Sequence, residues 1–243
     1  MRAERSMTRE VILGNVERIR RELAEASEGR YPAPRLVPVT KTRTPEEILV
    51  LREAGIGEIG ENRVQELESK LPELGGAFRI HLIGRLQRNK VRQVIGDVCM
   101  IQSVDSLPLA EEISSRAVKA GLRMDVLAEI SPAGEKQKGG VPAAETESFL
   151  RRIAPLEGIR VKGLMAVMPL TDDEAYLDGL FAEMRRLFER IRETAVPGVD
   201  MEELSMGMSG DYRLAARHGA TLVRVGSAIF GPRTARTEGE NAK

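Results

Sequence analysis

The amino-acid sequence predicts an α/β protein, a single-domain (β/α)8 barrel of the TIM type preceded by one extra N-terminal helix. Across about residues 35–233, eight short apolar runs alternate with helical segments at fairly even intervals. Alternation of this kind is typical of a parallel sheet with crossover helices, and eight repeats in about 200 residues suit a closed barrel. No Gly-x-Gly-x-x-Gly follows the first apolar run, so an open doubly wound sheet is the less favoured alternative.

Local patterns define the start of several helices. The extra helix, over about residues 7–27, has aliphatic residues separated by four, three and four positions, which places them on one face. These residues are Ile12, Val16, Ile19 and Leu23. Residues 44–47 predict the next helix start, with a hydroxyl N-cap, proline at the first helical position and glutamate at N3. Residues 171–174 predict a similar capping box for a long helix that continues through Ile191.

The remaining elements follow from the apolar runs and the segments between them. The predicted strands lie at about residues 36–39, 56–60, 79–83, 98–103, 124–130, 160–167, 203–206 and 221–225. The other predicted helices lie at about residues 45–54, 61–72, 87–95, 106–120 and 142–154, with a short helix around 214–216. We expect one domain over residues 1–243, with the barrel over about 35–233 and a disordered polar tail over about 234–243.

Composition excludes several classes of protein. Lys plus Arg and Asp plus Glu both total 37, so the formal charge is zero and nothing favours nucleic acid or a membrane surface as partner. The single cysteine, Cys99, excludes an internal disulfide and fits a reducing compartment. No apolar run reaches the roughly 20 residues that span a bilayer, and the charged N-terminus differs from a signal peptide. We therefore expect a cytoplasmic protein.

Lys41 ends the first predicted strand, at the turn that leads into the next helix. In parallel barrels, ligands bind at this C-terminal edge of the strands. Three interpretations are open: a solvated or ion-paired side chain, which is the common case, a Schiff base with a carbonyl compound, or a point charge beside a phosphate.

Small residues follow the last two predicted strands. Residues 205–210 read Ser-Met-Gly-Met-Ser-Gly, and residues 226–231 read Gly-Ser-Ala-Ile-Phe-Gly. Glycine lets backbone N–H groups approach an anion, serine adds a hydroxyl donor, and barrel phosphate sites often use these two loops. Ordinary turns are the alternative for either loop alone. Together the loops favour phosphate binding, with these candidate residues: Ser205, Gly207, Met208, Ser209, Gly226 and Ser227.

Arg224 lies within the last apolar run, just before the second loop. A charged side chain inside a barrel strand is costly unless it has a partner, and pairing with Glu61 or Asp211 is the structural interpretation. The functional interpretation is a donor to a flat heteroaromatic ring whose phosphate lies in the neighbouring loops. A lysine imine, a ring-nitrogen partner and a phosphate cup are the parts of a pyridoxal phosphate (PLP) site.

Five further residues are weaker candidates. His81 alternates with aliphatic neighbours and fits a buried core histidine as well as a ligand contact. Asn62 fits a helix cap, and Met165 fits packing in the barrel or against a ligand ring. Lys136 and Lys138 lie in a glycine-rich loop and are most simply solvated. Two histidines and one cysteine lie too far apart for a metal site, and no Ser-His-Asp arrangement is visible.

Six segments carry a family resemblance: residues 39–42 (VTKT), 60–66 (GENRVQE), 81–87 (HLIGRLQ), 163–166 (GLMA), 204–209 (LSMGMS) and 223–231 (VRVGSAIFG). In this order they resemble the pyridoxal phosphate homeostasis proteins. The likeness runs from about residue 36 to residue 231, which is nearly the whole chain. Six ordered segments are far more specific than any one of these motifs.

The resemblance implies a barrel like the N-terminal domain of alanine racemase, with Lys41 as an internal aldimine and Arg224 facing the pyridine nitrogen. It also places the two small-residue loops around the phosphate and Lys138 in a mobile loop. Arg85 and Arg88 stand where the family commonly has proline and serine, which puts local contacts in doubt more than cofactor binding. The chain also lacks the β-rich second domain through which alanine racemase completes its active site.

The function implied by the resemblance is intracellular vitamin B6 homeostasis. The protein would bind pyridoxal 5'-phosphate, buffer it and deliver it to apo-enzymes without catalytic turnover, and we expect a monomer. The alternative is a PLP-dependent amino acid racemase, which needs a second acid or base, for which His81 and Tyr212 are the candidates. A Schiff-base aldolase or sugar-phosphate enzyme on the same barrel is the third interpretation.

Overall fold

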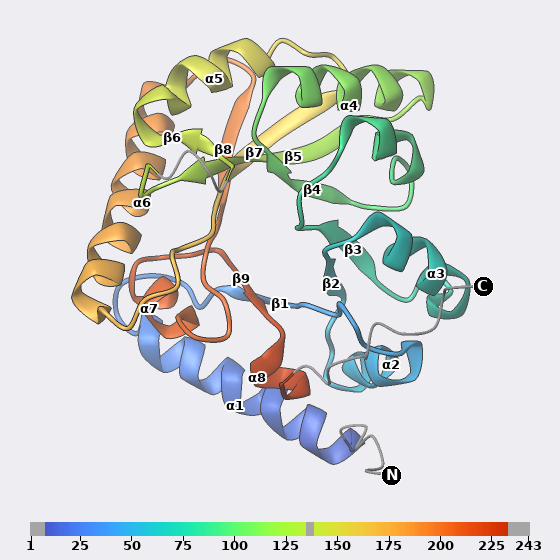
Figure 1. Ribbon diagram of the computed structural model, residues 1–243. Helices are drawn as coiled ribbons and strands as arrows, with labels where there is room; N and C mark the ends of the chain where they lie inside the picture. Colours follow the sequence, from blue (N-terminus) through green and yellow to red (C-terminus); the bar gives the residue numbers. More distant parts are fainter. Residues whose placement is uncertain (1–7, 135–138, 233–243) are drawn as a thin grey trace.

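The computed structural model describes residues 8–134 and 139–232, in which eight parallel strands form a nearly closed barrel (Figure 1). In sheet order these are β1 (Arg35–Pro38), β9 (Leu222–Val225), β8 (Val199–Ser205), β7 (Ile159–Ala166), β5 (Met124–Ser131), β4 (Met100–Val104), β3 (Arg79–Leu82) and β2 (Glu58–Glu61). A short strand, β6 (Val141–Pro142), pairs with β5. β1 and β2 meet at a bridge between Val39 and Gly60, where the Thr40 N–H donates to the Gly60 carbonyl at 3.0 Å. The predicted barrel is confirmed.

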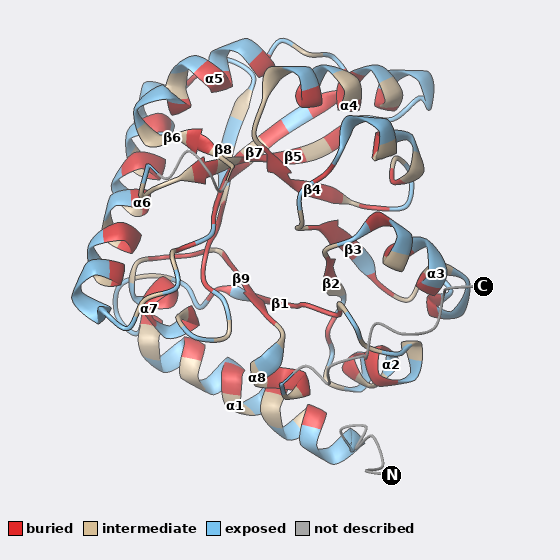
Figure 2. Ribbon diagram, in the orientation of Figure 1, coloured by how far each residue is buried: buried red, intermediate tan, exposed pale blue. Residues whose placement is uncertain are grey.

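Helices surround the barrel, and each helix buries the side that faces the strands (Figure 2). They are α1 (Arg9–Ser27), α2 (Pro45–Glu53), α3 (Val64–Leu74), α4 (Leu107–Lys119), α5 (Thr146–Ile153), α6 (Glu174–Thr194), α7 (Tyr212–Arg217) and α8 (Ser227–Phe230), with the 3-10 helices η1 (Arg88–Gln93) and η2 (Ala143–Glu145). The capping box at the start of α2 is confirmed, because Glu47 N–H donates to Thr44 Oγ1 at 3.4 Å and Thr44 N–H donates to the Glu47 carboxylate at 3.1 Å.

The extra helix α1 is part of the core. It packs against α7 and α8 (Figure 1), which have only six and four residues and cover little of the barrel by themselves. The aliphatic face predicted from its spacing is buried: Ile12, Val16, Ile19 and Leu23. The Asn15 amide also donates to the Ile229 carbonyl at 2.9 Å, which fixes the register of α1 on α8.

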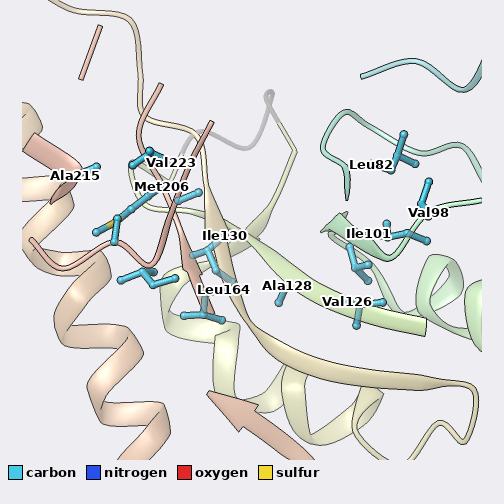
Figure 3. Close-up of a cluster of buried hydrophobic side chains, with 14 of the residues drawn as sticks. Leu82, Val98, Ile101, Val126, Ala128, Ile130, Leu164, Met206, Ala215 and Val223 are labelled. Atoms are coloured by element: carbon cyan, nitrogen blue, oxygen red, sulfur yellow. The ribbon is translucent and has the colours of Figure 1, made fainter. Parts of the chain in front are cut away.

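The main hydrophobic core lies between the strands and the helices. Alternate residues of β5 belong to it, namely Val126, Ala128 and Ile130 (Figure 3). Because successive side chains of a strand point to opposite faces, the intervening Leu127 points into the barrel, where it packs with Met100 and Met165. Met165 therefore takes the barrel-packing role that was one of its two interpretations.

Several predicted boundaries are wrong. The helix expected over residues 87–95 is the shorter 3-10 helix η1, which has one buried residue, Val91, and so lacks an apolar face. The N-cap of α6 is Asp173, which accepts from the Tyr176 N–H at 2.9 Å, rather than Thr171. β6 and η2 occupy the start of the helix expected from residue 142. β8 begins at Val199 rather than 203, because its first half is not buried and shows no apolar run.

Some predictions lie outside the described residues: the roles of Lys136 and Lys138 and the disordered tail over about 234–243. The single-domain limits of 1–243 stay a prediction. In the described part of the chain, no helix is long and apolar enough to cross a membrane. Across residues 8–134 and 139–232, no group of three or more His, Cys, Asp or Glu side chains is arranged to hold a metal ion.

Candidate functional site

A cavity of about 570 Å³ lies at the C-terminal ends of the strands, and both Lys41 and Arg224 line it. Its other walls come from the segments that follow β2, β3, β7, β8 and β9. Seven of the eleven predicted site residues line it: Lys41, Asn62, Met208, Ser209, Arg224, Gly226 and Ser227. The fold thus brings together the lysine, the arginine and both small-residue loops.

The turn that carries Lys41 has an unusual backbone conformation. The next residue, Thr42, has a φ of +65°, a left-handed conformation that is costly for a β-branched residue. The Thr42 N–H donates to the carboxylate of Glu66 on α3, and the Arg43 N–H donates to the Thr40 carbonyl at 3.1 Å. These bonds hold the turn and so position Lys41 at the cavity.

A buried ion cluster centred on Lys70 supports this turn. Lys70 is 6% exposed, and its Nζ donates to the Thr40 carbonyl at 2.8 Å, to Glu61 at 2.9 Å and to Glu66 at 2.7 Å. Burial raises the pKa of Glu61 against the lowering effects of Lys70 and Thr40. The predicted pairing of Glu61 with Arg224 is wrong, because Glu61 pairs with Lys70. Sequence reasoning missed the cluster, although the i,i+4 spacing of Glu66 and Lys70 is a recognisable ion-pair pattern.

Arg224 is buried, with 3% exposure, and two of its nitrogens are bonded within the barrel. Its Nη1 donates to Ser205 Oγ at 2.6 Å, and its Nη2 donates to a backbone carbonyl of β7 at 2.8 Å. Burial lowers the pKa of Arg224 to about 10, against the raising effects of Asp211 and Glu129. Direct pairing with Asp211 is also wrong, since that carboxylate accepts from the Met208 N–H at 2.5 Å. Arg224 therefore remains a cationic donor at neutral pH.

Ser205 connects Arg224 to a chain of buried hydrogen bonds through the barrel interior. The Ser205 hydroxyl donates to Gln102 Oε1 at 2.6 Å, and Gln102 Nε2 lies 2.8 Å from His81 Nδ1. His81 Nε2 lies 3.7 Å from a carboxylate oxygen of Glu58, near the opposite end of the barrel. Three polar side chains beneath the cavity, Ser205, Gln102 and His81, are therefore linked to its arginine by hydrogen bonds.

The protonation of His81 is set by competing effects. Burial lowers the pKa of His81, but the Cys99 sulfur and the Glu58 carboxylate outweigh it and raise this pKa to about 9. A protonated ring would carry a hydrogen on Nδ1, which would oppose the Gln102 amide donor. The polarity of this short buried bond therefore depends on the protonation state of His81.

Four predicted site residues do not line the cavity. Ser205, His81 and Met165 are at most 1% exposed and lie in the barrel interior. Gly207 has a φ of +95°, and a Cβ there would come within 2.5 Å of the Ala215 Cβ. Packing of α7 therefore requires this glycine. Ser205 and His81 reach the cavity indirectly, through the hydrogen-bond chain that ends on Arg224.

Ser209 joins the two small-residue loops at the cavity wall. Its Oγ accepts hydrogen bonds from the Gly226 N–H at 3.1 Å and from the Ala228 N–H at 3.2 Å. A hydroxyl oxygen that accepts twice still has its own proton to donate. Ser227 is exposed and lines the same wall. The loops thus offer two hydroxyl donors to an anion in the cavity.

Glu129 on β5 was not among the predicted site residues. It lines a neighbouring cavity of about 320 Å³, which shares Val167 with the first. Burial and the Asp105 carboxylate raise the pKa of Glu129 to about 7, against the lowering effects of Arg224 and Arg85. A glutamate within the apolar run of β5 was the sequence feature that could have revealed it.

We expect Glu129→Gln to stabilise the protein at pH 8 but not at pH 5. The folded pKa of Glu129, about 7, lies above its ordinary value of 4.5, so the native state loses stability as pH rises through this window. Glutamine removes that loss, and we expect a gain of roughly 1–3 kcal/mol at pH 8. Urea unfolding at both pH values measures it, with the exposed Glu157→Gln as control. An equal effect at both pH values would contradict the assignment.

Comparison with known proteins gives the same picture. Residues 14–234 match the alanine racemase N-terminal domain family. A pyridoxal phosphate homeostasis protein of Aquifex aeolicus is 36% identical over 219 residues, which cover 90% of this chain and 95% of the relative. Another, from Deinococcus radiodurans, is 41% identical over 210 residues, covering 85% and 94%. The structure of PipY from Synechococcus elongatus PCC7942 with PLP bound matches with a TM-score of 0.80 and 32% identity, covering 90% of this chain and all of PipY.

The barrel and the lysine at its mouth define a protein of the alanine racemase N-terminal domain class. Within this class the relatives above cover most of the chain at more than 30% identity. The chain belongs to the family of pyridoxal phosphate homeostasis proteins. The resemblance predicted from six sequence segments is therefore confirmed.

Proposed function

We propose that this protein binds pyridoxal 5'-phosphate as an aldimine of Lys41 and acts in vitamin B6 homeostasis, buffering the cofactor and delivering it to apo-enzymes. The observation that carries the proposal is the single cavity lined by Lys41, Arg224 and the loops at Ser209 and Ser227. The cofactor bound to PipY and the names of the relatives support this choice of ligand.

The lining residues fit the recognisable parts of this cofactor. Lys41 offers an amine for its aldehyde, Arg224 offers a donor for its ring nitrogen, and Ser209, Gly226 and Ser227 offer donors for its phosphate. When bound, the cofactor supplies a ring that withdraws electrons from an attached amine. A cationic arginine disfavours protonation of the ring nitrogen, and an unprotonated ring is a weaker electron sink. This arrangement suits storage better than turnover.

An amino acid racemase is the alternative, and it needs a second acid or base opposite Lys41. Tyr212 bonds to Glu22 on α1, outside the barrel, and His81 lies beneath the cavity. Among the described residues that line the cavity there is no His, Tyr, Cys, Asp or Glu, which supports a binding role. Exchange of the α-proton of alanine in deuterated buffer, lost on Lys41→Ala, would instead favour a racemase.

The near-visible absorption spectrum tests the proposal. We expect a yellow protein whose borohydride-reduced pyridoxyl adduct maps to Lys41. A colourless protein that PLP cannot reconstitute would contradict cofactor binding. Borohydride trapping that requires a sugar phosphate would instead favour the aldolase interpretation.

We expect Ser209→Ala and Ser227→Ala each to weaken the binding of the phosphate-bearing cofactor. Each substitution removes one hydroxyl donor, which contributes on the order of 1 kcal/mol, or about fivefold in the dissociation constant. Ser209→Ala should have the larger effect, because it also removes the bonds to the second loop. Equilibrium dialysis measures both, with the exposed Ser148→Ala as control. Unchanged affinity in both variants would place the phosphate elsewhere.

The monomeric state and the cytoplasmic location expected from the sequence stay predictions. Sedimentation velocity at several protein concentrations tests the first. The proposed delivery step is tested by mixing the loaded protein with an apo-enzyme and following the return of that enzyme's activity. The control is the same apo-enzyme with free PLP, in the amount that the loaded protein releases by dissociation. Reactivation by the loaded protein no faster than in this control would contradict direct delivery.

A further inference from the structure

A second groove, of about 940 Å³, lies beside the proposed cofactor cavity and shares Asn62 with it. Its walls are the start of α3, the start of α4 and the segment from β3 into η1. Because the helices of a parallel barrel begin at the C-terminal ends of the strands, the groove opens on the same face as the cavity. The proposed cofactor role makes no use of it.

The groove is basic. Arg63, Arg85, Arg88 and Lys90 line it, and among its described lining residues Asp105 carries the single carboxylate. The chain as a whole has a formal net charge of zero. The groove therefore concentrates positive charge in a protein whose composition gives no overall excess.

Three of these cations have no partner in the part of the chain that the structure describes. Within residues 8–134 and 139–232, the side chains of Arg63, Arg88 and Lys90 make no hydrogen bond or ion pair. Other surface arginines, such as Arg9 and Arg151, do pair with carboxylates. Unpaired like charges that face one groove repel each other, and a bound anion would remove that repulsion.

Two helix N-termini add to the positive potential of this groove. α3 and α4 have 11 and 13 residues and begin at its walls, and neither N-cap, Arg63 or Ser106, gives its helix a side-chain hydrogen bond. The first N–H groups of these helices therefore remain as partial positive charges. The four cationic side chains and the two helix ends act on the same space.

We propose that this groove docks an acidic segment of a partner protein. The cations lie on two separate segments, Arg63 at the N-cap of α3 and the others between β3 and the end of η1. Charges distributed in this way match several carboxylates along an extended chain better than one compact anion. The groove floor includes buried Val64, Leu86 and Leu109, which can receive apolar side chains between the acids. This inference goes beyond the cofactor role and does not depend on it.

Fluorescence anisotropy tests the proposal with a short labelled peptide in which glutamate alternates with alanine, and with its glutamine counterpart. We expect saturable binding of the glutamate peptide only, weakened by salt as exposed charges are screened. The variant Arg63→Gln/Arg88→Gln/Lys90→Gln should lose at least about tenfold in affinity. Each exposed ion pair by itself changes the affinity by less than about tenfold, and this variant removes three of them. The substituted residues lie outside the cofactor cavity.

The matched control is Arg21→Gln/Lys119→Gln/Arg186→Gln, which removes the same charge from exposed positions on α1, α4 and α6. It should bind the peptide as the wild type does, and both variants should keep the cofactor absorption of the wild type. Equal losses in the two variants, equal binding of both peptides, or no saturable binding at low salt would overturn the proposal. Displacement by inorganic phosphate as effective as displacement by unlabelled peptide would identify a small-anion site and also overturn it.

Discussion

Replacing Lys41 by alanine is expected to abolish the covalent chromophore of the protein while the barrel stays folded. Lys41 is half-buried at the cavity wall and belongs to no hydrophobic cluster, so its removal should change the unfolding free energy by less than about 1 kcal/mol. Among the described residues that line the cavity, no other side chain offers an amine that could replace it. Absorption spectra before and after borohydride reduction measure the loss, and urea unfolding measures the stability.

The control for this experiment is Lys119→Ala, an exposed lysine at the end of α4. It should keep the full chromophore. A reduced adduct found on a different lysine of the Lys41→Ala protein would place the covalent site elsewhere. An unfolded Lys41→Ala protein would contradict the claim that this side chain serves the ligand rather than the fold.

Replacing Lys70 by methionine is expected to cost roughly 3–5 kcal/mol of unfolding free energy. The substitution leaves the carboxylate of Glu61, which is fully buried, without its cation, and breaking one side of a buried pair is strongly destabilising. It also removes the bond from Nζ to the Thr40 carbonyl, beside Lys41. We therefore expect weaker retention of the chromophore in addition to the loss of stability. Urea unfolding and dialysis measure the two effects.

The double variant Glu61→Gln/Lys70→Met separates the two causes. It removes the uncompensated carboxylate, so much of the stability should return. The bond from Lys70 Nζ to the Thr40 carbonyl stays absent, so retention of the chromophore should stay weak. Lys119→Met is the control for the loss of an exposed lysine. A Lys70→Met protein as stable as the wild type would show that water compensates Glu61, contrary to its complete burial.

The features of the fold and site that depend on periodic patterns in the sequence could be predicted. The barrel followed from alternating apolar and helical runs, and the burial of α1 followed from the spacing of Ile12, Val16, Ile19 and Leu23. Lys41 and Arg224 line one cavity as expected, because the ends of parallel strands meet at one edge whatever the details of the helices between them.

The partners of buried charges could not be predicted in the same way. Whether Glu61 faces Arg224 or α3 depends on which side of β2 it occupies, and one position along a strand reverses that side. The four-residue strand β2 contains too few apolar residues to fix this alternation from the sequence. The Glu61–Lys70 pair and the chain from Ser205 to His81 join residues on different elements, so the i,i+4 spacing of Glu66 and Lys70 is the one local sign of either.

The hydrogen bonds beneath the cavity begin at a donor that cannot be reversed. Arg224 donates to Ser205, Ser205 donates to Gln102, and Gln102 Nε2 lies 2.8 Å from His81 Nδ1. Arginine has no acceptor with which to reverse its bond, so Ser205 Oγ must accept from Arg224, and the Gln102 amide and the His81 ring orient around that donor. A substitution of Gln102 or His81 therefore also alters the hydrogen bonding of Arg224. The residue types at these four bonded positions are constrained together rather than one at a time.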